Sequence, residues 1–143
     1  MAAGAKEFSA GGVVVRGGEC VVIIPTRRAA DGSKVVALPK GHPDGEETAL
    51  DAALREVREE AGVSGSYVAD LGEVSYWYQR KGKRIQKSVA FFLLAYEAGD
   101  VADHDHEVEK AWWMPLAEAA EALTYPGERQ MVQKALLHLQ TTE

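Results

Sequence analysis

The sequence predicts an α+β fold, in which a central mixed β-sheet is layered between helices as an α/β/α sandwich. Strand-like segments lie on both sides of one central helical segment, and two more helical segments end the chain. A doubly wound parallel fold would instead alternate strands and helices regularly. At 143 residues, 46% of them hydrophobic, the chain can bury one core, so we expect a single domain over 1–143.

The first third of the chain contains three strand-like runs. Residues 8–15 and 19–24 are rich in valine and isoleucine and are joined by a Gly17-Gly18 turn. After a polar loop over 25–33, the run 34–38 predicts a short third strand.

The central helix is predicted over 47–61. Leu50, Leu54 and Val57 recur at three- and four-residue steps, which gives a narrow apolar stripe. Gly62 then suits a helix C-cap, where the backbone turns left-handed.

The second half reads as a long hairpin followed by a strand and two helices. The predicted elements are strands 67–79 and 84–97 with a basic tip at 80–83, a strand over 108–114, and helices over 116–123 and 126–140.

Composition restricts the class of protein. The formal net charge of −6 disfavours a protein that wraps long nucleic acid, although a local basic cluster can still hold a phosphate-rich small molecule. The single cysteine, Cys20, fits a reducing compartment. No apolar run approaches the roughly 20 residues that span a bilayer, and the N-terminus has no signal-peptide core. We therefore expect a cytoplasmic protein without a membrane partner. The oligomeric state, monomer or homodimer, stays open.

Three acids on the central helix carry the strongest chemical signal. Glu56, Glu59 and Glu60 fall within an arc of about 100° on one helix face. Carboxylates this close repel one another unless a cation cancels their charge, and oxygen ligands suit magnesium, manganese or calcium. Arg55 lies one turn before Glu59 and can pair with it or with Glu47. The alternative is a solvated, salt-bridged helix face, which is common for an isolated REVREE.

The spacing around these acids resembles the signature of the Nudix hydrolases. Gly41 is followed after five residues by Glu47, after seven more by Arg55-Glu56-Val57, and then by Glu59-Glu60 and Gly62-Val63. The flanking segments ALPKGH, KSVAFFLL and HEVEKAWWMPL extend the resemblance to about residues 8–137. The resemblance implies the Nudix fold, a loop-helix-loop catalytic motif, and hydrolysis of a phosphoric anhydride bond that depends on Mg²⁺, with Mn²⁺ as an alternative.

The same resemblance implies roles for individual residues. Metal ligands would be Glu56, Glu59, Glu60 and the carbonyl of Lys40. Glu107 would be an outer metal ligand or the general base, and the base stays open among Glu56, Glu59 and Glu107. Structural support would come from Gly41, Glu47, Arg55 and Gly62. Many relatives have Pro-Gly-Glu before the helix, whereas this chain has Asp44-Gly45-Glu46-Glu47, so Glu46 is a competitor for the role of Glu47.

Segments outside the signature are similar to the asymmetrically cleaving diadenosine tetraphosphate hydrolases. These segments are LPKGH, QKSV, HEVEKAWW and LTYP. The resemblance implies that Lys40 and Lys87 contact phosphates and that Tyr78 and Tyr125 stack on adenine. Among the histidines, His42 is the best placed to bind substrate because it adjoins Gly41. Tyr76 and Tyr78 share one face of their strand, so part of this aromatic set is expected to be packing.

Three other functions remain open at this level. One is hydrolysis of damaged nucleoside triphosphates such as 8-oxo-dGTP, which releases pyrophosphate. Another is removal of pyrophosphate from RNA 5′ ends, against which the net negative charge counts. The third is a nucleotide-binding regulator without catalysis, against which the complete set of carboxylates counts.

Overall fold

The computed structural model describes residues 5–141, so the first four and last two residues of the expected 1–143 domain lie outside the described part. The strands are β1 (Ala5–Arg16), β2 (Glu19–Pro25), β3 (Lys40–Gly41), β4 (Val63–Arg80), β5 (Lys83–Gly99) and β6 (Val108–Pro115). The helices are α1 (Ala49–Ala61), α2 (Leu116–Ala122) and α3 (Pro126–Thr141), with a 3₁₀ turn, η1, at Val101–Asp103.

The strands form one mixed sheet. Its order is β4-β5-β1-β2-β6, and β3 pairs with β1 beside this path. β1 and β5 run parallel from the pair Ala5–Ile85 to the pair Val15–Ala95, while the other pairings are antiparallel. The expected mixed sheet is therefore confirmed.

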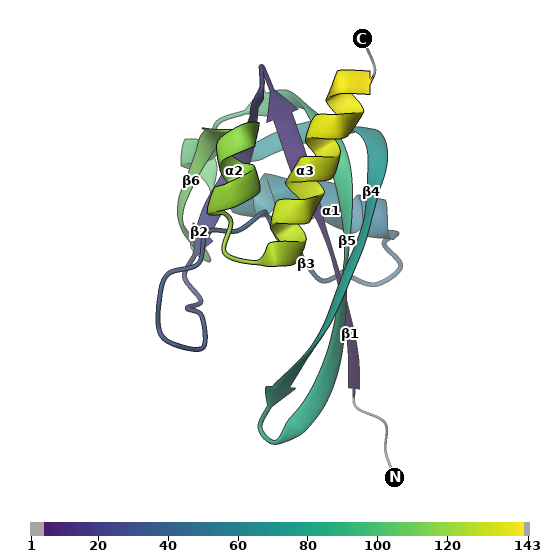
Figure 1. Ribbon diagram of the computed structural model, residues 1–143, viewed down its shortest axis with the longest axis vertical. Coiled ribbons are helices and arrows are strands. Elements are labelled where there is room, and N and C mark those ends of the chain that lie inside the picture. Colours follow the sequence, from purple (N-terminus) through teal and green to yellow (C-terminus); the bar gives the residue numbers. More distant parts are fainter. Residues whose placement is uncertain (1–4, 142–143) are drawn as a thin grey trace.

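Helices cover both faces of this sheet (Figure 1). α1 packs on one face through Val57, and α3 packs on the other through Met131 and Val132. Val13 and Val14 are both fully buried because successive β1 side chains point to opposite covered faces. The α/β/α layering expected from the sequence is present.

Both ends of α1 are fixed by local hydrogen bonds. Thr48 is the N-cap, and its side chain accepts from the Asp51 amide while the Asp51 carboxylate accepts from the Thr48 amide. Gly62 is the C-cap with φ of 77°, a left-handed conformation that favours glycine. The helix thus begins two residues later than expected, at Ala49.

The strand predicted over 34–38 is wrong. Only Ala37 pairs there, with Ile23, and the two-residue β3 at Lys40–Gly41 takes its place. The amide of Val36 donates to the Thr124 side chain and the amide of Leu38 donates to Glu128. Side chains from the C-terminal half therefore satisfy amides that a strand would have paired.

The β4–β5 hairpin and the first residues of β1 project from the body as an arm (Figure 1). Glu7 on β1 accepts from the Tyr78 hydroxyl at 2.5 Å and pairs with Arg80 at 2.6 Å. These contacts tie the outer hairpin to β1. No helix within residues 5–141 is long and apolar enough to cross a membrane.

Replacing the N-cap threonine should destabilise the protein without altering its site. We expect Thr48→Ala to lower the free energy of unfolding by about 1 kcal/mol, because the Asp51 amide loses its acceptor. Urea unfolding measures this loss. Ser64→Ala is the control, since its hydroxyl makes only a 3.5 Å contact with the Ala98 carbonyl. An equal loss in both variants would contradict the capping role.

Candidate active site

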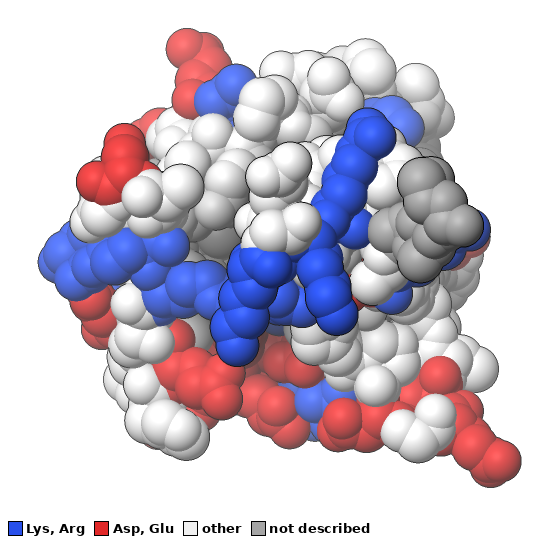
Figure 2. Space-filling view, turned by 90° about the horizontal axis from the view of Figure 1, so that it is seen from below, with Lys and Arg blue, Asp and Glu red and all other residues white. Residues whose placement is uncertain are grey.

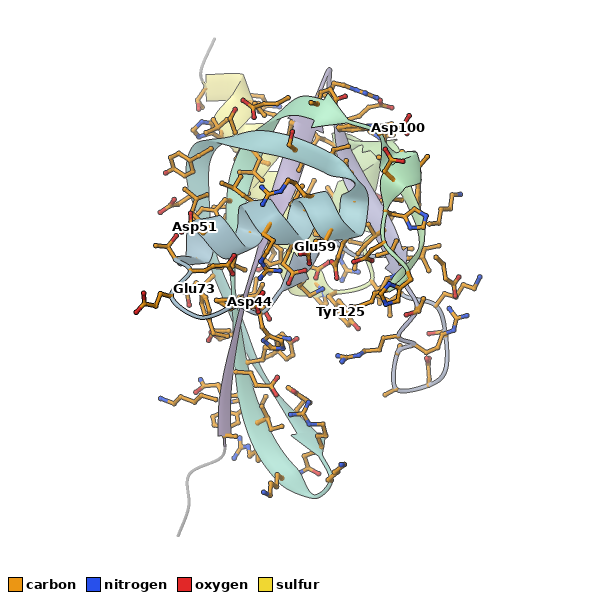
Figure 3. All side chains as sticks on the ribbon, turned by 180° about the vertical axis from the view of Figure 1, so that it is seen from behind. Asp44, Asp51, Glu59, Glu73, Asp100 and Tyr125 are labelled. Carbon is orange, nitrogen blue, oxygen red and sulfur yellow. The ribbon has the colours of Figure 1, made fainter. Side chains whose placement is uncertain are left out.

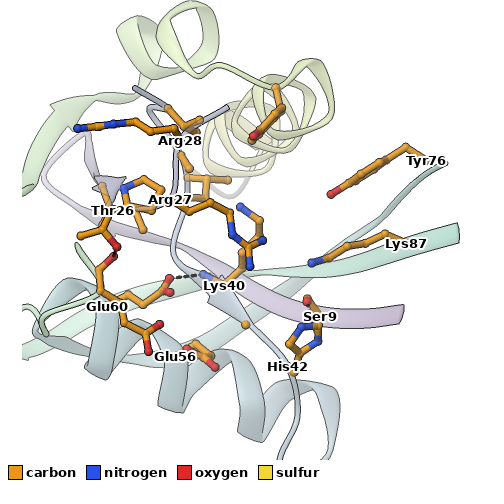
Figure 4. Close-up of a pocket in the computed structure, with 18 of the residues that line it drawn as sticks. Ser9, Thr26, Arg27, Arg28, Lys40, His42, Glu56, Glu60, Tyr76 and Lys87 are labelled. Carbon is orange, nitrogen blue, oxygen red and sulfur yellow. Dashed lines mark hydrogen bonds between the residues drawn. The ribbon is translucent and has the colours of Figure 1, made fainter. Parts of the chain in front are cut away.

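A cavity of about 590 Å³ opens between α1, the loop after β2, and the sheet (Figure 4). Its walls come from segments distant in sequence, which the sheet brings together. The lining residues are Ser9, Ile23, Pro25, Thr26, Arg27, Arg28, Val35, Ala37, Leu38, Lys40, Gly41, His42, Asp44, Glu56, Glu60, Tyr76, Lys87, Glu107 and Tyr125.

Arg55 organises the acidic side of this cavity. Its guanidinium donates to both oxygens of Glu47, at 2.8 and 2.9 Å, and to Glu56 at 3.2 Å and Glu59 at 3.1 Å. It also donates to the carbonyl of His42 at 2.9 Å, so it fixes the loop before α1. These bonds from Arg55 lower the pKa of Glu47 to about 2. Spacing selected Glu47 over Glu46 as the partner of Arg55, and the structure shows this pair.

Two of the three helix acids point into the cavity, and both are unusually protected from water. Burial raises the pKa of Glu60 to about 7, although the Lys40 amide, which donates to Glu60 at 2.9 Å, acts against that rise. Burial also raises the pKa of Glu56. The carboxylate of Glu56 lies against the backbone of Gly41, where a Cβ would collide with it. Gly41 is thus required by the position of Glu56.

The third acid, Glu59, lies outside the cavity lining. Its side chain is 49% exposed and is held by Arg55. Figure 3 shows Glu59 along the lower edge of α1.

The opposite side of the cavity is basic. Lys40, Lys87, Arg27 and Arg28 all contribute to its walls. Burial lowers the pKa of Lys87, and the charges of Lys40 and Arg27 lower it further. Figure 2 shows Lys and Arg in a band across this face, with Asp and Glu gathered along one border of the band. Cations that repel one another in this way indicate a site for an anion.

The family model of the NUDIX domain matches residues 6–135 of this sequence. The chain belongs to the Nudix family.

Curated Nudix relatives carry different names. A protein of Mycobacterium tuberculosis named "Putative mutator protein MutT4" is 37% identical over 90% of this chain and 54% of its own length. An 8-oxo-(d)GTP phosphatase of Mycolicibacterium smegmatis is 34% identical over 68% of this chain and 29% of its own length. The chain thus spans about half the length of the first relative and less than a third of the length of the second. An asymmetrical bis(5′-nucleosyl)-tetraphosphatase of Caenorhabditis elegans is 31% identical over 67% of this chain and 70% of its own length.

Solved structures share the Nudix fold. A NUDIX hydrolase from Nitrosomonas europaea superimposes with a TM-score of 0.74 at 19% identity, over 93% of this chain and 90% of that one. A C. elegans Ap4A hydrolase in a binary complex gives 0.67 at 22% identity, over 94% and 98%. At these identities the likeness concerns the fold alone.

The acidic end of the Nudix site suits a divalent cation by its chemistry. Glu56 and Glu60 supply carboxylate oxygens within one cavity, and each acid's ionisation is opposed by a neighbouring acid. Within residues 5–141, however, no three metal-binding side chains already converge as a ligand set. Arg55 instead holds Glu59 and contacts Glu56.

The structure brings most of the residues expected in the site together, but it leaves Tyr78 outside. Among the expected residues, the cavity is lined by Lys40, Gly41, His42, Glu56, Glu60, Lys87, Glu107 and Tyr125. Tyr78 lies farther out on the arm, where its hydroxyl donates to Glu7, and it is not among the residues that line the cavity. Tyr76, two residues earlier on the same strand face, lines the cavity.

Sequence reasoning missed part of the site. Arg27 and Arg28 lie in a segment read only as a polar loop, although two adjacent arginines just after a strand were a usable signal. Glu128 was also missed. It repeats with Met131, Val132 and Ala135 on the buried face of α3, and an acid at such a position is itself a signal.

The raised pKa of Glu60 predicts a pH effect on stability in metal-free protein. The folded pKa, about 7, lies above the ordinary value of 4.5, so folding favours the protonated acid. That stabilisation is complete below about pH 4.5 and is lost as the pH rises through 7. Between pH 5 and 8, unfolding measurements with a chelator should show the wild type losing on the order of 3 kcal/mol more than Glu60→Gln.

The control for this pH effect is Glu73→Gln, which removes an exposed acid. Its stability should follow the wild type across the whole range. If Glu60→Gln runs parallel to the wild type as well, burial of the Glu60 carboxyl is refuted.

Proposed function

We propose that this protein hydrolyses a phosphoric anhydride bond in a nucleotide, with a bound Mg²⁺ or Mn²⁺ as cofactor. The observation that carries this proposal is one cavity with two chemically opposite ends. Glu56 and Glu60 form the acidic end, and Lys40, Lys87 and Arg27 form the basic end. A polyphosphate that lies across the cavity meets cations on one side and a cation-binding carboxylate pair on the other.

The cofactor would be held by Glu56, Glu59, Glu60 and the carbonyl of Lys40. A divalent cation at such a site neutralises phosphate charge and acidifies water. Arg55 fixes Glu56 and Glu59, and the Lys40 amide fixes Glu60, before any ligand arrives. Burial of Glu56 and Glu60 disfavours their charged forms, and a cation bound beside them would offset that cost.

In the proposed reaction, a water oxygen bonds to phosphorus while the bridging P–O bond breaks. The leaving phosphate departs with the bridging oxygen, and a carboxylate accepts the proton of the water. Glu56 and Glu107 both line the cavity, whereas Glu59 stays outside it on Arg55. The geometry therefore favours Glu56 or Glu107 as the base.

A second cavity supports a nucleoside at one end of the substrate. It measures about 380 Å³, and Val74, Val89 and Phe91 contribute apolar walls. Tyr76 and Tyr125 line both cavities, so an aromatic base beside the phosphate site would meet two rings. This arrangement supports a nucleotide, and the likeness to the C. elegans tetraphosphatase favours diadenosine tetraphosphate, cleaved to ATP and AMP.

A second candidate is hydrolysis of an oxidised nucleoside triphosphate. It is favoured by the likeness to the M. smegmatis 8-oxo-(d)GTP phosphatase. The same cavity accommodates the chemistry, because a single base and three phosphates need less room than a dinucleotide.

Product analysis separates these functions. The protein is incubated with Mg²⁺ and a panel of diadenosine tetraphosphate, 8-oxo-dGTP and 5′-triphosphate RNA, and the products are identified by chromatography. ATP with AMP from the first substrate supports the proposal. Monophosphate with pyrophosphate from 8-oxo-dGTP supports the second candidate, and pyrophosphate released from RNA would identify an RNA-end hydrolase. Binding without any cleavage would indicate a nucleotide-binding regulator and would refute catalysis.

Glu60→Gln should lower turnover by a factor on the order of 100 or more, because it removes a cavity carboxylate needed for the cofactor. Initial rates with the best substrate measure the loss. The variant should remain folded at neutral pH, because a neutral glutamine avoids the cost of a buried charge at this position. Glu73→Gln is the matched control and should keep full activity. Comparable turnover in Glu60→Gln and wild type would remove Glu60 from the site.

Tyr76→Ala and Tyr78→Ala form a matched pair on one strand face. Tyr76 lines both cavities, so its loss should raise KM for a dinucleotide about tenfold, within the range of one lost base-stacking contact. Tyr78→Ala should leave KM within about twofold, because its hydroxyl bonds Glu7 on the arm. A larger effect at Tyr78 would return the stacking role to that residue.

A further inference from the structure

Glu128, a buried carboxylate on α3, reaches the basic end of the cavity from behind. It lies in the first turn of the helix and is 4% exposed. One of its oxygens accepts from the Lys40 ammonium at 2.8 Å, and the other accepts from the Leu38 amide at 2.9 Å. A charge removed from water is costly unless it is paired in this way, so the two contacts explain how an acid can occupy this position.

Packing alone does not require an acid at this position. Glu128 shares the buried face of α3 with Met131, Val132 and Ala135, which pack into the core. A well-packed apolar residue at such a position is often as stabilising as a buried ion pair. The reason for an acid here must therefore be its partner. That partner is Lys40, which lines the cavity.

Lys40 has two acids within electrostatic reach. Glu128 and Glu60 both raise its pKa and oppose the effect of burial. The lysine side chain is a flexible stem with a compact charge at its end, so an opposite charge determines where the ammonium rests. If Glu128 did not hold it, the attraction of Glu60 would draw the ammonium toward the acidic end of the cavity.

We propose that Glu128 is a positioning residue that holds the Lys40 ammonium at the basic end of the cavity, away from Glu60. An ammonium has three donors, and the one given to Glu128 leaves two for phosphate oxygens. The Glu60 carboxylate is kept free for a cation. This inference rests on the proposed function, since it assigns Lys40 to the phosphates of the substrate.

The same short segment also carries one aromatic wall. Tyr125 lies three residues before Glu128, its carbonyl accepts from the Glu128 amide at 3.1 Å, and its ring centroid is 5.8 Å from the Lys40 ammonium. The start of α3 therefore sets the phosphate-binding lysine and the base-contacting ring relative to each other.

Glu128→Gln tests this role because the two effects of the change differ in sign. Loss of negative charge should favour binding of a polyphosphate, whereas loss of the hold on Lys40 should slow the reaction. Glutamine keeps the shape of the side chain and an acceptor for the Leu38 amide, but it removes the negative charge. Loss of an anion does not by itself weaken the attraction of a polyphosphate to the cavity, so a lower kcat with KM unchanged or lower would report misplacement of the Lys40 ammonium. We expect kcat to fall about tenfold with KM unchanged or lower. Glu118→Gln, an exposed acid in the first turn of α2, is the control and should match the wild type.

A double-mutant cycle shows whether Glu128 acts through Lys40. In a Lys40→Met background, adding Glu128→Gln should cost no further kcat, since the group to be positioned is gone. Full kcat in Glu128→Gln alone, or the same tenfold fall in the Lys40→Met background, would overturn the inference.

A measurement independent of turnover separates this inference from the proposed function. Acetylation of Lys40 by acetic anhydride is followed by mass spectrometry, with the exposed Lys6 as an internal reference. Lys40 should be modified several-fold faster in Glu128→Gln than in wild type, while Lys6 reacts equally in both. Equal rates at Lys40 would overturn the positioning role. If the wild type cleaves no nucleotide while this protection is present, the proposed function fails and the hold of Glu128 on Lys40 stands.

Discussion

The rest of the site depends on the contacts of Arg55. This one guanidinium bonds the loop carbonyl of His42, both oxygens of Glu47, and the carboxylates of Glu56 and Glu59. A planar cation with five donors can hold several acids at once, which a lysine ammonium cannot do with the same fixed geometry. Since the loop and the helix share this contact, the backbone of Gly41 and the carboxylate of Glu56 come to lie against each other.

The cavity maintains a separation of charge that water would otherwise screen. Acids line one end and cations line the other, and Lys40 contributes its ammonium to the basic end while its backbone reaches the acidic end. Its amide donates to Glu60 while its ammonium pairs with Glu128. A single residue on the two-residue strand β3 thus touches both ends through different atoms. A ligand that carries both signs of charge, such as a phosphate chain with its bound cation, matches this arrangement better than a ligand of one charge.

Local features of the site could be predicted from sequence, whereas distant ones could not. The α1 acids and the Arg55–Glu47 pair depend on fixed spacing within one helix and its preceding loop, so the pattern reveals them. The wrong strand over 34–38 has a different origin, because the Leu38 amide bonds a residue 90 positions away. The acid that accepts this bond, Glu128, stands out locally on the buried face of α3, but its partners Leu38 and Lys40 are distant in sequence.

Tyr78 shows why it is difficult to predict from sequence which side chains of a long strand reach a cavity. β4 has register irregularities after Ser64, between Tyr67 and Ala69, and between Asp70 and Gly72. Each irregularity changes how far the strand advances for a given number of residues, and it can change which face a side chain occupies. Tyr76 and Tyr78 share a face, so alternation alone cannot choose between them. The choice depends on which of the two residues lies beside the cavity and which lies farther out on the arm. The aromatic wall of the cavity is therefore a property of sheet register, while the acidic wall is a property of one helix.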